Sequence, residues 1–473
     1  MARQVDVAII GAGTAGLQAL DEVSRRTDSF VLIDDGPLGT LCARAGCMPS
    51  KALIQAARDF HRRGRFAGRG ITGAEGLRAH LPAVLRHVRE MRDRFAAGLA
   101  DKTRRLAGDR LIRGHARFTA PGSLDIDGET IVARRIIVAT GSSPVVPGPW
   151  RSFGRRILTT DDLFDREVLP QRLAVVGLGP LGLEMAQALA RLGVSVTGIE
   201  SGPTVAGLDD PVAADTAARL MAQEFPVALD RGHAEIAPAD DTDPDGPLRV
   251  TCGDTDGVVD GVLAATGRKP VLADLNLEAL GVPLDGTGMP DVDPRTCRIV
   301  GAPVYVAGDA TGGPAILHEA RDEGRIAGWN ATHPEDSAFR RRCPLQIVYT
   351  EPQIARVGAG WTEVEDLDVV TGTADFEDSG RAQIMGEARG VVRVYADRKD
   401  GRLLGACLVA PEGEHLAHLL TLAVEQERTV HDLAYMTTYH PGLEEALKPA
   451  FLEACGKASG GHPPSVGLPR LDD

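Results

Sequence analysis

Short runs of apolar residues, followed by a glycine-rich turn and a helical pattern, recur along the chain. The first run is Val5–Ile10, which leads into Gly11-Ala-Gly-Thr-Ala-Gly16 and then into a helical pattern from Leu17 to Val23. Phe30–Ile33 is a second apolar run. Because continuous apolar runs bounded by turn residues are typical of buried strands, the pattern predicts a strand–turn–helix–strand unit at the start of the chain.

The first glycine turn has the composition of a dinucleotide-binding loop. Gly11, Gly13 and Gly16 permit a tight turn and let the backbone approach a pyrophosphate, which free N–H groups of the following helix can bind. Asp34 closes the second strand, where a carboxylate accepts hydrogen bonds from ribose hydroxyls. Glycine spacing alone is weak evidence, but here both strands and the acid accompany it. We expect a bound nucleotide rather than a structural turn without a ligand.

The same pattern recurs from Leu173–Val176 onward. The distance from first glycine to closing acid is 23 positions in both copies, Gly11 to Asp34 and Gly177 to Glu200. Each copy is followed by a related strand that ends in Ala-Thr-Gly. Two copies predict two nucleotides bound to one chain. The residues that carry these echoes are Gly177, Gly179, Gly182 and Glu200 in the second turn, and Thr140, Gly141 and Gly267 in the Ala-Thr-Gly segments.

The first copy is the longer of the two. From the first glycine to the Ala-Thr-Gly glycine it spans 130 positions, against 90 in the second copy. The additional residues include two cysteines, Cys42 and Cys47, and a long helical pattern from Gly76 to Ala107. The sequence therefore places a dithiol beside the first nucleotide.

Spacing limits what the two cysteines can form. Residues five apart in a regular α-helix have Cα atoms about 8–9 Å apart, whereas a disulfide needs about 4.4–6.8 Å. If Cys42 and Cys47 bond, the segment cannot be a regular helix, and Gly46 can supply an irregular backbone. Pro49 suits the first turn of a helix that starts just after Cys47 and includes Ser50–Ala57. The N-terminus of that helix would lower the pKa of a nearby thiol.

Other readings of the cysteines are a metal site or two unrelated buried thiols. Zinc pairs usually have C-x2-4-C spacing and a second pair elsewhere, which this chain lacks, so we expect no metal. The remaining cysteines are scattered singly and are expected to be free thiols in a reducing compartment: Cys252, Cys297, Cys343, Cys407 and Cys455.

Composition favours a soluble enzyme. The 473 residues suggest about three domains at roughly 150 residues each. A net charge of −14 argues against nucleic acid as a partner. No apolar stretch approaches about 18 residues and no signal peptide is evident, so we expect a cytoplasmic protein that is not bound to a membrane.

Taken together, the motifs resemble the pyridine nucleotide–disulfide oxidoreductase family, and most closely its dihydrolipoamide dehydrogenases, from residue 5 to about 455. The resemblance implies an α/β fold with two Rossmann-like nucleotide-binding domains and a C-terminal α+β dimerisation domain. It also implies FAD and NAD as cofactors. Val304–Asp309 resembles the family's second flavin motif. The residues implied for FAD are Gly11, Gly13, Gly16, Asp34, Lys51, Thr140, Gly141, Gly308 and Asp309, and those for NAD are Gly177, Gly179, Gly182, Glu200 and Gly267.

The resemblance also assigns roles to charged residues. Lys51 and Glu184 resemble the family's ion pair beside the flavin, although the helix dipole alone would also favour a carboxylate at Glu184. His440-Pro-Gly-Leu-Glu-Glu445 resembles the His-Pro-Thr-x-x-Glu signature, with His440 as base and Glu445 as its orienting partner. His462 precedes a proline too, but no acid follows it at that spacing. In the family this base reaches the disulfide of the other subunit, so a homodimer is expected.

The implied reaction oxidises dihydrolipoamide with NAD⁺ through a Cys42–Cys47 redox disulfide. Substrate thiolate attacks Cys42, His440 takes a proton, and Cys47 leaves as a thiolate against the flavin. Glu200 favours NAD because a carboxylate repels the 2′-phosphate of NADP, unless it merely ends a strand in solvent. The alternatives are an NAD(P)H-dependent reductase of another small disulfide, and a flavin-bound redox sensor.

The motifs also predict domain limits. We expect a FAD-binding domain with the dithiol over 1–150, an NAD-binding domain over 151–270, a central segment that completes the FAD domain over 271–342, and an interface domain over 343–473. Strands near Val391–Tyr395 and Leu403–Val409 predict a sheet in the last of these. Pro449 should split the helical stretch that starts near Leu443.

Three departures from the family's motifs lie near the cysteines and the base. Gly39-Thr-Leu-Cys42 stands where Gly-Gly-Thr-Cys is usual, Arg44 replaces an asparagine between the cysteines, and Gly442 replaces a threonine. Arg44 adds a cation that is expected to depress a thiol pKa. Because the changes surround the reactive groups, they bear on the identity of the substrate rather than on the fold.

Overall fold

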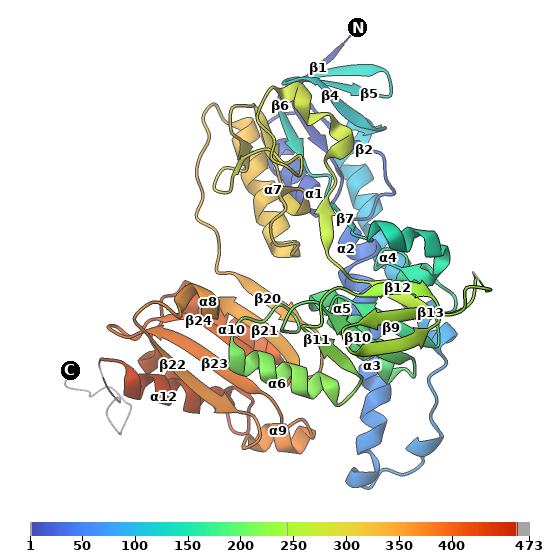
Figure 1. Cartoon of the computed structure of the whole chain (residues 1–473). Coiled ribbons are helices and arrows are strands. Elements are labelled where there is room, and N and C mark those ends of the chain that lie inside the picture. The colour runs from blue at the N-terminus through green and yellow to red at the C-terminus, as the bar shows by residue number, and fades with distance from the viewer. Residues whose placement is uncertain (1, 244, 460, 462–473) are drawn as a thin grey trace, which may run out of the picture.

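The computed structural model describes residues 2–243, 245–459 and 461. Figure 1 shows one sheet-containing part at the top, with the N-terminus, and two others beside each other below it, one of which contains the C-terminal sheet. The first sheet has the order β17-β18-β19-β6-β1-β2-β3, and β1 (Arg3–Ile10) is parallel to both its neighbours. Its other strands are β2 (Phe30–Asp34), β3 (Leu111–Arg113), β4 (Ala116–Ala120), β5 (Ser123–Ile126), β6 (Glu129–Val138), β17 (Val292–Asp293), β18 (Arg298–Ile299) and β19 (Val304–Val306).

Residues from the middle of the chain thus complete the N-terminal sheet. Strand β19 is parallel to β6, and α7 (Leu317–Thr332) packs on α1 (Thr14–Ser24). Two glycines of α7 make this approach possible: a Cβ on Gly324 would lie 2.2 Å from the Ala15 carbonyl oxygen, and one on Gly328 would lie 2.8 Å from that of Ala19. The return of this segment agrees with the expected central segment, while the domain limits themselves stay predictions.

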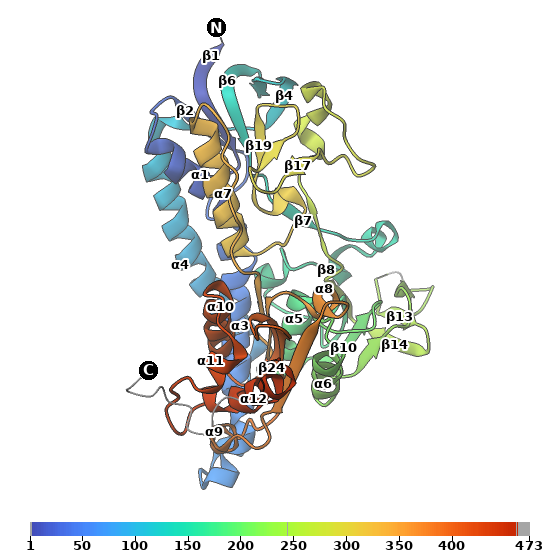
Figure 2. The same ribbon diagram turned by 90° about the vertical axis from the view of Figure 1, so that its left-hand side faces the viewer.

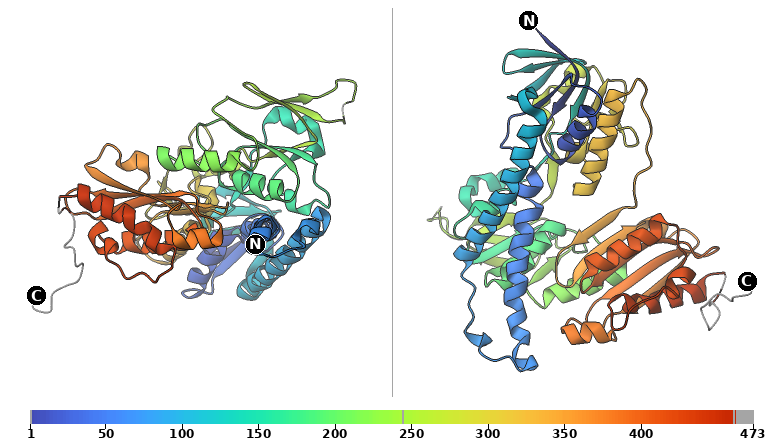
Figure 3. Two further views of the ribbon diagram at one scale, coloured as in Figure 1. Left: turned by 90° about the horizontal axis from the view of Figure 1, so that it is seen from below. Right: turned by 180° about the vertical axis from the view of Figure 1, so that it is seen from behind.

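The chain forms two long helices between β2 and β3, and these helices pack against each other. They are α3 (Cys47–His61) and α4 (Leu81–Ala107), and Figure 2 and the right-hand view of Figure 3 show them along one side of the molecule. The expected helix from Gly76 begins five residues later, at Leu81. Pro82 occupies the first turn, where proline is tolerated because its missing N–H has no helical partner.

The second sheet is entirely parallel and has the order β11-β10-β9-β15-β8. It holds the second glycine turn between β9 and α5. A three-stranded antiparallel ribbon is inserted in the chain between its strands β11 and β15. The elements are β8 (Ile157–Leu158), β9 (Arg172–Val176), α5 (Pro180–Arg191), β10 (Ser195–Glu200), α6 (Pro211–Ala222), β11 (Val227–Leu229), β12 (Glu235–Pro238), β13 (Leu248–Cys252), β14 (Thr255–Val259) and β15 (Gly261–Ala264).

The two connections between the first and second sheets pair with each other. Strand β7 (Ser142–Pro144) is antiparallel to β16 (Arg268–Pro270). The hydroxyl of Thr140 donates to the Val271 carbonyl over 2.6 Å, and that of Thr266 donates to the Val145 carbonyl over 2.7 Å. The two Ala-Thr-Gly segments therefore form one symmetrical crossing point.

The C-terminal sheet is antiparallel, with the order β20-β21-β24-β23-β22. The two predicted strands are present as β23 and β24. Pro449 lies in the first turn of α12, after a short 3-10 turn over 444–447, so the expected split is confirmed. The elements are β20 (Leu345–Val348), β21 (Gln353–Gly358), α8 (Trp361–Val364), β22 (Val369–Asp375), α9 (Gly380–Met385), β23 (Val391–Asp397), β24 (Leu403–Ala410), α10 (Gly413–Glu425), α11 (Val430–Ala434) and α12 (Lys448–Lys457).

Within the described residues, no helix has the length and apolar character needed to cross a membrane. The His462-Pro463 pair, which the sequence separates from the expected base, lies outside the described residues.

Candidate active site

The dithiol lies at a break between two helices. Cys42 is in α2 (Leu41–Arg44) and Cys47 is the first residue of α3. Gly46 has φ −115° and ψ −117°, which no regular helix contains, and a Cβ there would lie 3.1 Å from the Cα of Cys42. The predicted irregular backbone is confirmed, and the helix starts at Cys47 itself. The structure contains Cys42 and Cys47 as free thiols, and Cys42 is half-buried while Cys47 is exposed.

The pKa values of the two thiols are shifted in opposite directions because the thiols are hydrogen-bonded to each other. Donation from Cys42 stabilises the Cys47 thiolate, and Lys51 adds to this, so the pKa of Cys47 falls to about 7. The protein atoms around the sulfur oppose this shift by desolvating it, although the residue as a whole is exposed. The same bond, together with burial, raises the pKa of Cys42 well above its ordinary value. Of the two sulfurs, Cys47 is the one that carries charge near neutral pH.

Lys51 lies one turn along α3 and bridges to the second sheet. Its Nζ is 2.9 Å and 3.0 Å from the two carboxylate oxygens of Glu184, which is on α5 and only 3% exposed. The close approach expected from the sequence is therefore present. This partly buried ion pair links α3 to α5.

Tyr349, which the sequence did not single out, holds both partners of this pair. Its backbone N–H donates to Glu184 Oε1 over 2.9 Å, and the Lys51 Nζ lies 4.6 Å from the centre of its ring. Burial and a hydrogen bond to Glu414 raise the pKa of the Tyr349 hydroxyl to about 12. No spacing links this tyrosine to Lys51 or Glu184, so only the packed structure reveals it.

The first glycine turn is built as expected. A Cβ on Gly11 would lie 2.3 Å from the Ala139 carbonyl oxygen, and one on Gly16 would lie 1.8 Å from the Gly11 carbonyl oxygen. Gly13 is different, because the nearest atom to an added Cβ is 3.9 Å away. Two glycines thus permit the backbone to close, and the third leaves open space at the N-terminus of α1. Asp34 accepts from the Ala12 N–H over 2.7 Å and pairs with Arg113 over 3.1 Å.

The second glycine turn repeats this geometry. A Cβ on Gly177 would lie 2.2 Å from the Ala265 carbonyl oxygen, and one on Gly182 would lie 1.9 Å from that of Gly177. Gly179 again has no atom within 4 Å of an added Cβ. Glu200 accepts from the Leu178 N–H over 2.7 Å, in the place that Asp34 takes in the first copy.

A cavity of about 250 Å³ opens beside the first turn. The glycine turn lines it, and so do Thr140 and Gly141 of the first Ala-Thr-Gly segment. Gly141 has φ +74°. The open space at Gly13, the free helix N-terminus and the acid at Asp34 fit a dinucleotide with its pyrophosphate at α1.

Arg44 also lines this cavity, which corrects one expectation. Its guanidinium donates to the Pro37 carbonyl over 2.5 Å, on the cavity side of α2. The cation that lowers the pKa of Cys47 is Lys51. Arg44 follows Cys42 by two positions in α2, and side chains two positions apart in a helix do not share a face.

Asp309 and its preceding strand are placed as the second motif predicts. β19 ends at Val306, and Gly308 (φ +73°) and Asp309 start the 3-10 turn over 308–311. The Asp309 carboxylate accepts from the Ser142 hydroxyl over 2.6 Å, next to Gly141. Asp309 therefore reaches the segment that borders the first cavity.

His440 lies in the C-terminal part of the chain, between α11 and α12. Its Nδ1 lies 3.1 Å from Glu445 Oε2, and the side chain is 84% exposed. The Gly442 N–H, together with His440, lowers the pKa of Glu445. The carboxylate orients the ring and leaves Nε2 directed away from it, at the surface of this chain. Three other histidines, His318, His415 and His418, are partly or largely exposed.

A buried charge network beside the Lys51–Glu184 pair also escaped the sequence. Arg191 of α5 is 4% exposed and bonds Glu224 over 2.6 Å and Glu351 over 2.5 Å, while Arg58 of α3 pairs with Glu351 and Glu412. The network borders a cavity of about 230 Å³. Its arginines hold the pKa of Glu351 down at about 2, against the effect of burial. Three elements far apart in the sequence are tied together here.

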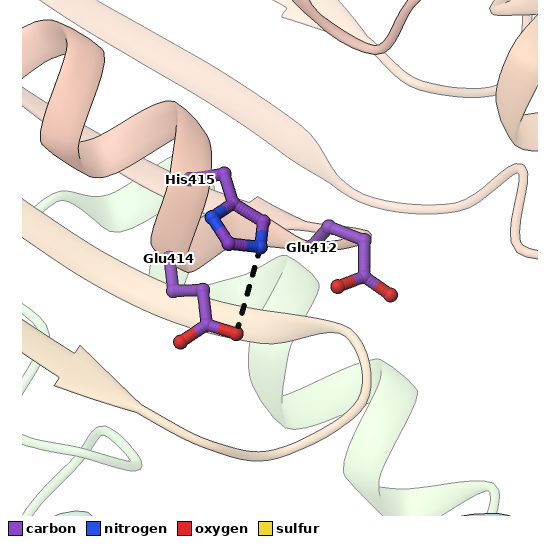
Figure 4. Close-up of side chains that lie close together, drawn as sticks. All are labelled: Glu412, Glu414 and His415. Carbon is purple, nitrogen blue, oxygen red and sulfur yellow. Dashed lines mark ion pairs between the residues drawn. The ribbon is translucent and has the colours of Figure 1, made fainter.

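Glu412, Glu414 and His415 lie on the rim of this network, with one ligand atom each within 4.8 Å of the others (Figure 4). Glu412 already binds Arg58, and Glu414 is 3.5 Å from the Gln353 amide and bonded to Tyr349. An adjacent guanidinium opposes a further cation, so these residues are explained as part of the ion-pair network.

Comparison with known proteins identifies the family. The family model for pyridine nucleotide-disulphide oxidoreductases matches residues 5–324, and the model for the dimerisation domain of these enzymes matches residues 345–451. The chain belongs to the pyridine nucleotide-disulphide oxidoreductase family. These oxidoreductases, the dihydrolipoyl dehydrogenases included, use FAD and NAD(H). The expected family, fold and pair of cofactors are thereby confirmed.

Individual members of the family are similar over nearly their whole length. A dihydrolipoyl dehydrogenase of Thermus scotoductus is 34% identical, covering 94% of this chain and 96% of its own. One from Halobacterium salinarum is 32% identical, covering 96% and 97%. Among solved structures, LpdA of Mycobacterium tuberculosis has a TM-score of 0.81 at 26% identity, covering 94% and 99%. The disulfide reductase RclA of Escherichia coli has a TM-score of 0.80 at 23% identity, covering 95% and 99%, which shows the shared fold.

Proposed function

We propose that this oxidoreductase oxidises dihydrolipoamide with NAD⁺ through a disulfide between Cys42 and Cys47. The observation that carries the proposal is the unequal pair of thiols, in which Cys47 has a pKa of about 7 at the N-terminus of α3 and Cys42 is its hydrogen-bond donor. Such a pair is suited to exchange, because the sulfur with the lower pKa is the better leaving group. The similarity to dihydrolipoyl dehydrogenases supports the choice of substrate.

The proposed exchange moves two electrons from substrate to protein. A substrate thiolate attacks the Cys42 sulfur, the Cys42–Cys47 bond breaks, and Cys47 leaves as a thiolate that Lys51 stabilises. The second substrate thiolate then displaces Cys42 and closes the substrate disulfide, so Cys42 leaves as a sulfur that takes a proton. His440, oriented by Glu445, takes the proton of the first substrate thiol. The proton of the second substrate thiol goes to Cys42 as that sulfur leaves, and the proton on His440 is released to solvent afterwards.

His440 would act on the dithiol of a partner subunit. Its ring is 84% exposed on its own chain, and the dimerisation domain that carries it supports a homodimer. An exposed, oriented base without a reacting group beside it is accounted for if a second copy supplies that group.

The two glycine turns would hold the two cofactors. FAD would lie along the first turn, with Gly13, Asp34, Thr140, Gly141, Gly308 and Asp309 around it and Lys51 near its reactive end. NAD would lie at Gly179, Glu200 and Gly267. When bound, FAD supplies the two-electron acceptor that links the dithiol to NAD. The chain's own contribution is to orient these groups, and the Lys51–Glu184 pair fixes α3 against α5 where the two sites meet.

Turnover with a panel of dithiols and disulfides tests the proposal. We expect NADH formation from dihydrolipoamide and NAD⁺, with far less from NADP⁺, because Glu200 repels a 2′-phosphate. C42A and C47A should each abolish turnover. A yellow protein that produces no NADH from dihydrolipoamide, yet reduces another small disulfide with NADH, would contradict the substrate and keep the reaction type. A yellow protein inactive with every disulfide would favour a redox sensor.

A further inference from the structure

The three unusual residues near the dithiol face the first cavity. Thr40, Leu41 and Arg44 all line it, together with Gly11 and Gly13 of the glycine turn. The departures from the family's motif therefore lie on the nucleotide side of α2. From their placement we infer that they modify the binding of the cofactor more than the chemistry of the thiols.

Of the three residues, Arg44 is the one that changes the charge of the cavity. Asp34, Asp35 and Asp274 line the cavity, and Arg44 is the lone lysine or arginine among its described lining residues. Asp34 is paired with Arg113, and Asp35 with His115 over 2.8 Å. Arg44 forms no ion pair with any described carboxylate. A dinucleotide brings two phosphate charges into a space that already has three carboxylates, so an unpaired cation there is well matched to it.

The position of the guanidinium is fixed before any ligand binds. Its Nη1 donates to the Pro37 carbonyl over 2.5 Å, which leaves its remaining N–H groups for another acceptor. A guanidinium has five donors in a rigid fork that suits phosphate oxygens. An asparagine at this position would be shorter and uncharged.

We propose that Arg44 binds the diphosphate of the FAD that the first turn holds, as a second anchor opposite the N-terminus of α1. The inference rests on the proposed placement of FAD at this turn. Arg44 is a cofactor-binding residue in this assignment, and it leaves the acidity of the thiols to Cys42 and Lys51.

Release of FAD from the holoenzyme tests the proposal. Flavin fluorescence rises when FAD leaves the protein, so dilution of wild type, R44N and R44K gives the dissociation constant of each. We expect binding to weaken about tenfold in R44N, the loss of one charge-assisted contact, and less in R44K. High salt should narrow the difference between wild type and R44N because it screens the pair. ADP should displace FAD more readily from R44N than from wild type.

R63N is the matched control. Arg63 is also half-buried and donates to a backbone carbonyl, that of Phe60, but it lies outside the cavity. R63N should bind FAD as wild type does. A second readout separates the two possible roles of Arg44: the pH dependence of Cys47 alkylation should be the same in wild type and R44N.

Each outcome decides the inference. If R44N binds FAD within twofold of wild type, Arg44 is not an anchor. If R44N instead shifts the alkylation of Cys47 to higher pH without weakening FAD, its role is the thiol effect that the sequence first indicated. If R63N weakens FAD as much as R44N does, the loss is a general effect of removing an arginine. Wild type without bound FAD would overturn the proposed function and the assignment of Arg44 with it, whereas a wild type that binds FAD as tightly as R44N does would overturn the assignment of Arg44 alone.

Discussion

The first and second glycine turns have nearly the same internal contacts, yet very different segments follow them. An added Cβ would meet the same type of carbonyl oxygen at 2.3 Å and 2.2 Å in the first glycines, and at 1.8 Å and 1.9 Å in the third. Each closing acid accepts one backbone N–H over 2.7 Å. The strand that ends at the closing acid is β2 in the first copy and β10 in the second. After β2 the chain forms α2, α3 and α4, whereas after β10 it forms α6, β11 and an antiparallel ribbon.

The comparison separates binding from chemistry. Nucleotide binding needs only the turn, the helix N-terminus and the acid, which are the parts that both copies share. The reactive groups Cys42, Cys47 and Lys51 belong to the insertion of the first copy alone. Glu184 of the second copy reaches this group through its ion pair with Lys51.

The largest effect is expected from substitutions that disrupt one glycine turn at a time. In G16A and G182A the new Cβ would overlap a backbone oxygen at under 2 Å, which neither copy can accommodate without moving the turn. We expect G16A to lose FAD. G182A should stay yellow and be reduced by dihydrolipoamide, but NADH should no longer reduce it. Absorbance of the flavin after each reductant measures both.

The middle glycines provide the control for this experiment. A Cβ on Gly13 or Gly179 would have no protein atom closer than 3.9 Å, so G13A and G179A should fold and fail only in binding their nucleotide. A G182A variant that NADH still reduces would show that the second copy does not hold the pyridine nucleotide.

The next effect concerns the insertion itself. Removing the donor in C42A should move the pKa of Cys47 from about 7 toward the about 8.5 of free cysteine. The thiolate is the reactive form, so at pH 7 alkylation of reduced Cys47 should slow about tenfold. K51M should raise the pKa of Cys47 as well, but by less, because the charge of Lys51 lowers that pKa less than the hydrogen bond from Cys42 does. Mass spectrometry of the Cys47 peptide over a pH series measures both.

C455A is the control, since that thiol is buried in the C-terminal part of the chain. An unchanged pH profile in C42A would show that the hydrogen bond between the thiols does not set their acidity.

A smaller effect tests the closing acids against each other. E200Q keeps an oxygen for the Leu178 N–H and removes the charge that repels a 2′-phosphate. We expect the preference for NAD over NADP, as the ratio of kcat/KM values, to fall about tenfold, or about 1.4 kcal/mol. D34N should leave this ratio unchanged and weaken FAD instead. A lower ratio in D34N would mean that the two copies had been assigned to the wrong nucleotides.

The smallest effect concerns Thr40, which has φ +59° and ψ +148°, a region that favours glycine. The family's usual residue there is glycine, so T40G should release strain of about 1 kcal/mol. T40G also loses the hydroxyl cap, but glycine at an N-cap costs only about a few tenths of a kcal/mol, so the melting temperature at saturating FAD should still rise. T40A keeps the strained Cβ and loses the hydroxyl that caps α2 through the Ala43 N–H, so it should be destabilised by about 1 kcal/mol. Thermal unfolding of the pair measures the two effects. A T40G protein that melts below T40A would contradict the presence of strain.

Much of the fold and part of the site could be predicted because their signals are local. The strand at Val5–Ile10, the break at Gly46 and the split at Pro449 each follow from residues within a few positions of one another. The start of α4 at Leu81 rather than Gly76 depended on one proline. The Lys51–Glu184 contact spans 133 positions and was predicted only through the family resemblance.

Other features had no sequence signal. Tyr349 reaches Lys51 and Glu184 because β20 ends beside α5, and Arg191 meets Glu351 for the same reason. Arg44 was expected beside the thiols, since it stands between them in the chain, but its side chain lines the cavity of the first glycine turn. The domain limits and the roles of His440 and Glu445 stay predictions.

The amino-acid sequence by itself determined the two nucleotide-binding units, the dithiol and the family, because glycine turns, apolar strands and closely spaced cysteines act within one short segment. The tertiary structure alone decided which charges meet: Lys51 with Glu184 and Tyr349, Arg191 with Glu351, and Arg44 with the first cavity. Charge contacts depend on distances of a few ångströms between side chains, and chain folding sets those distances for residues far apart in the sequence.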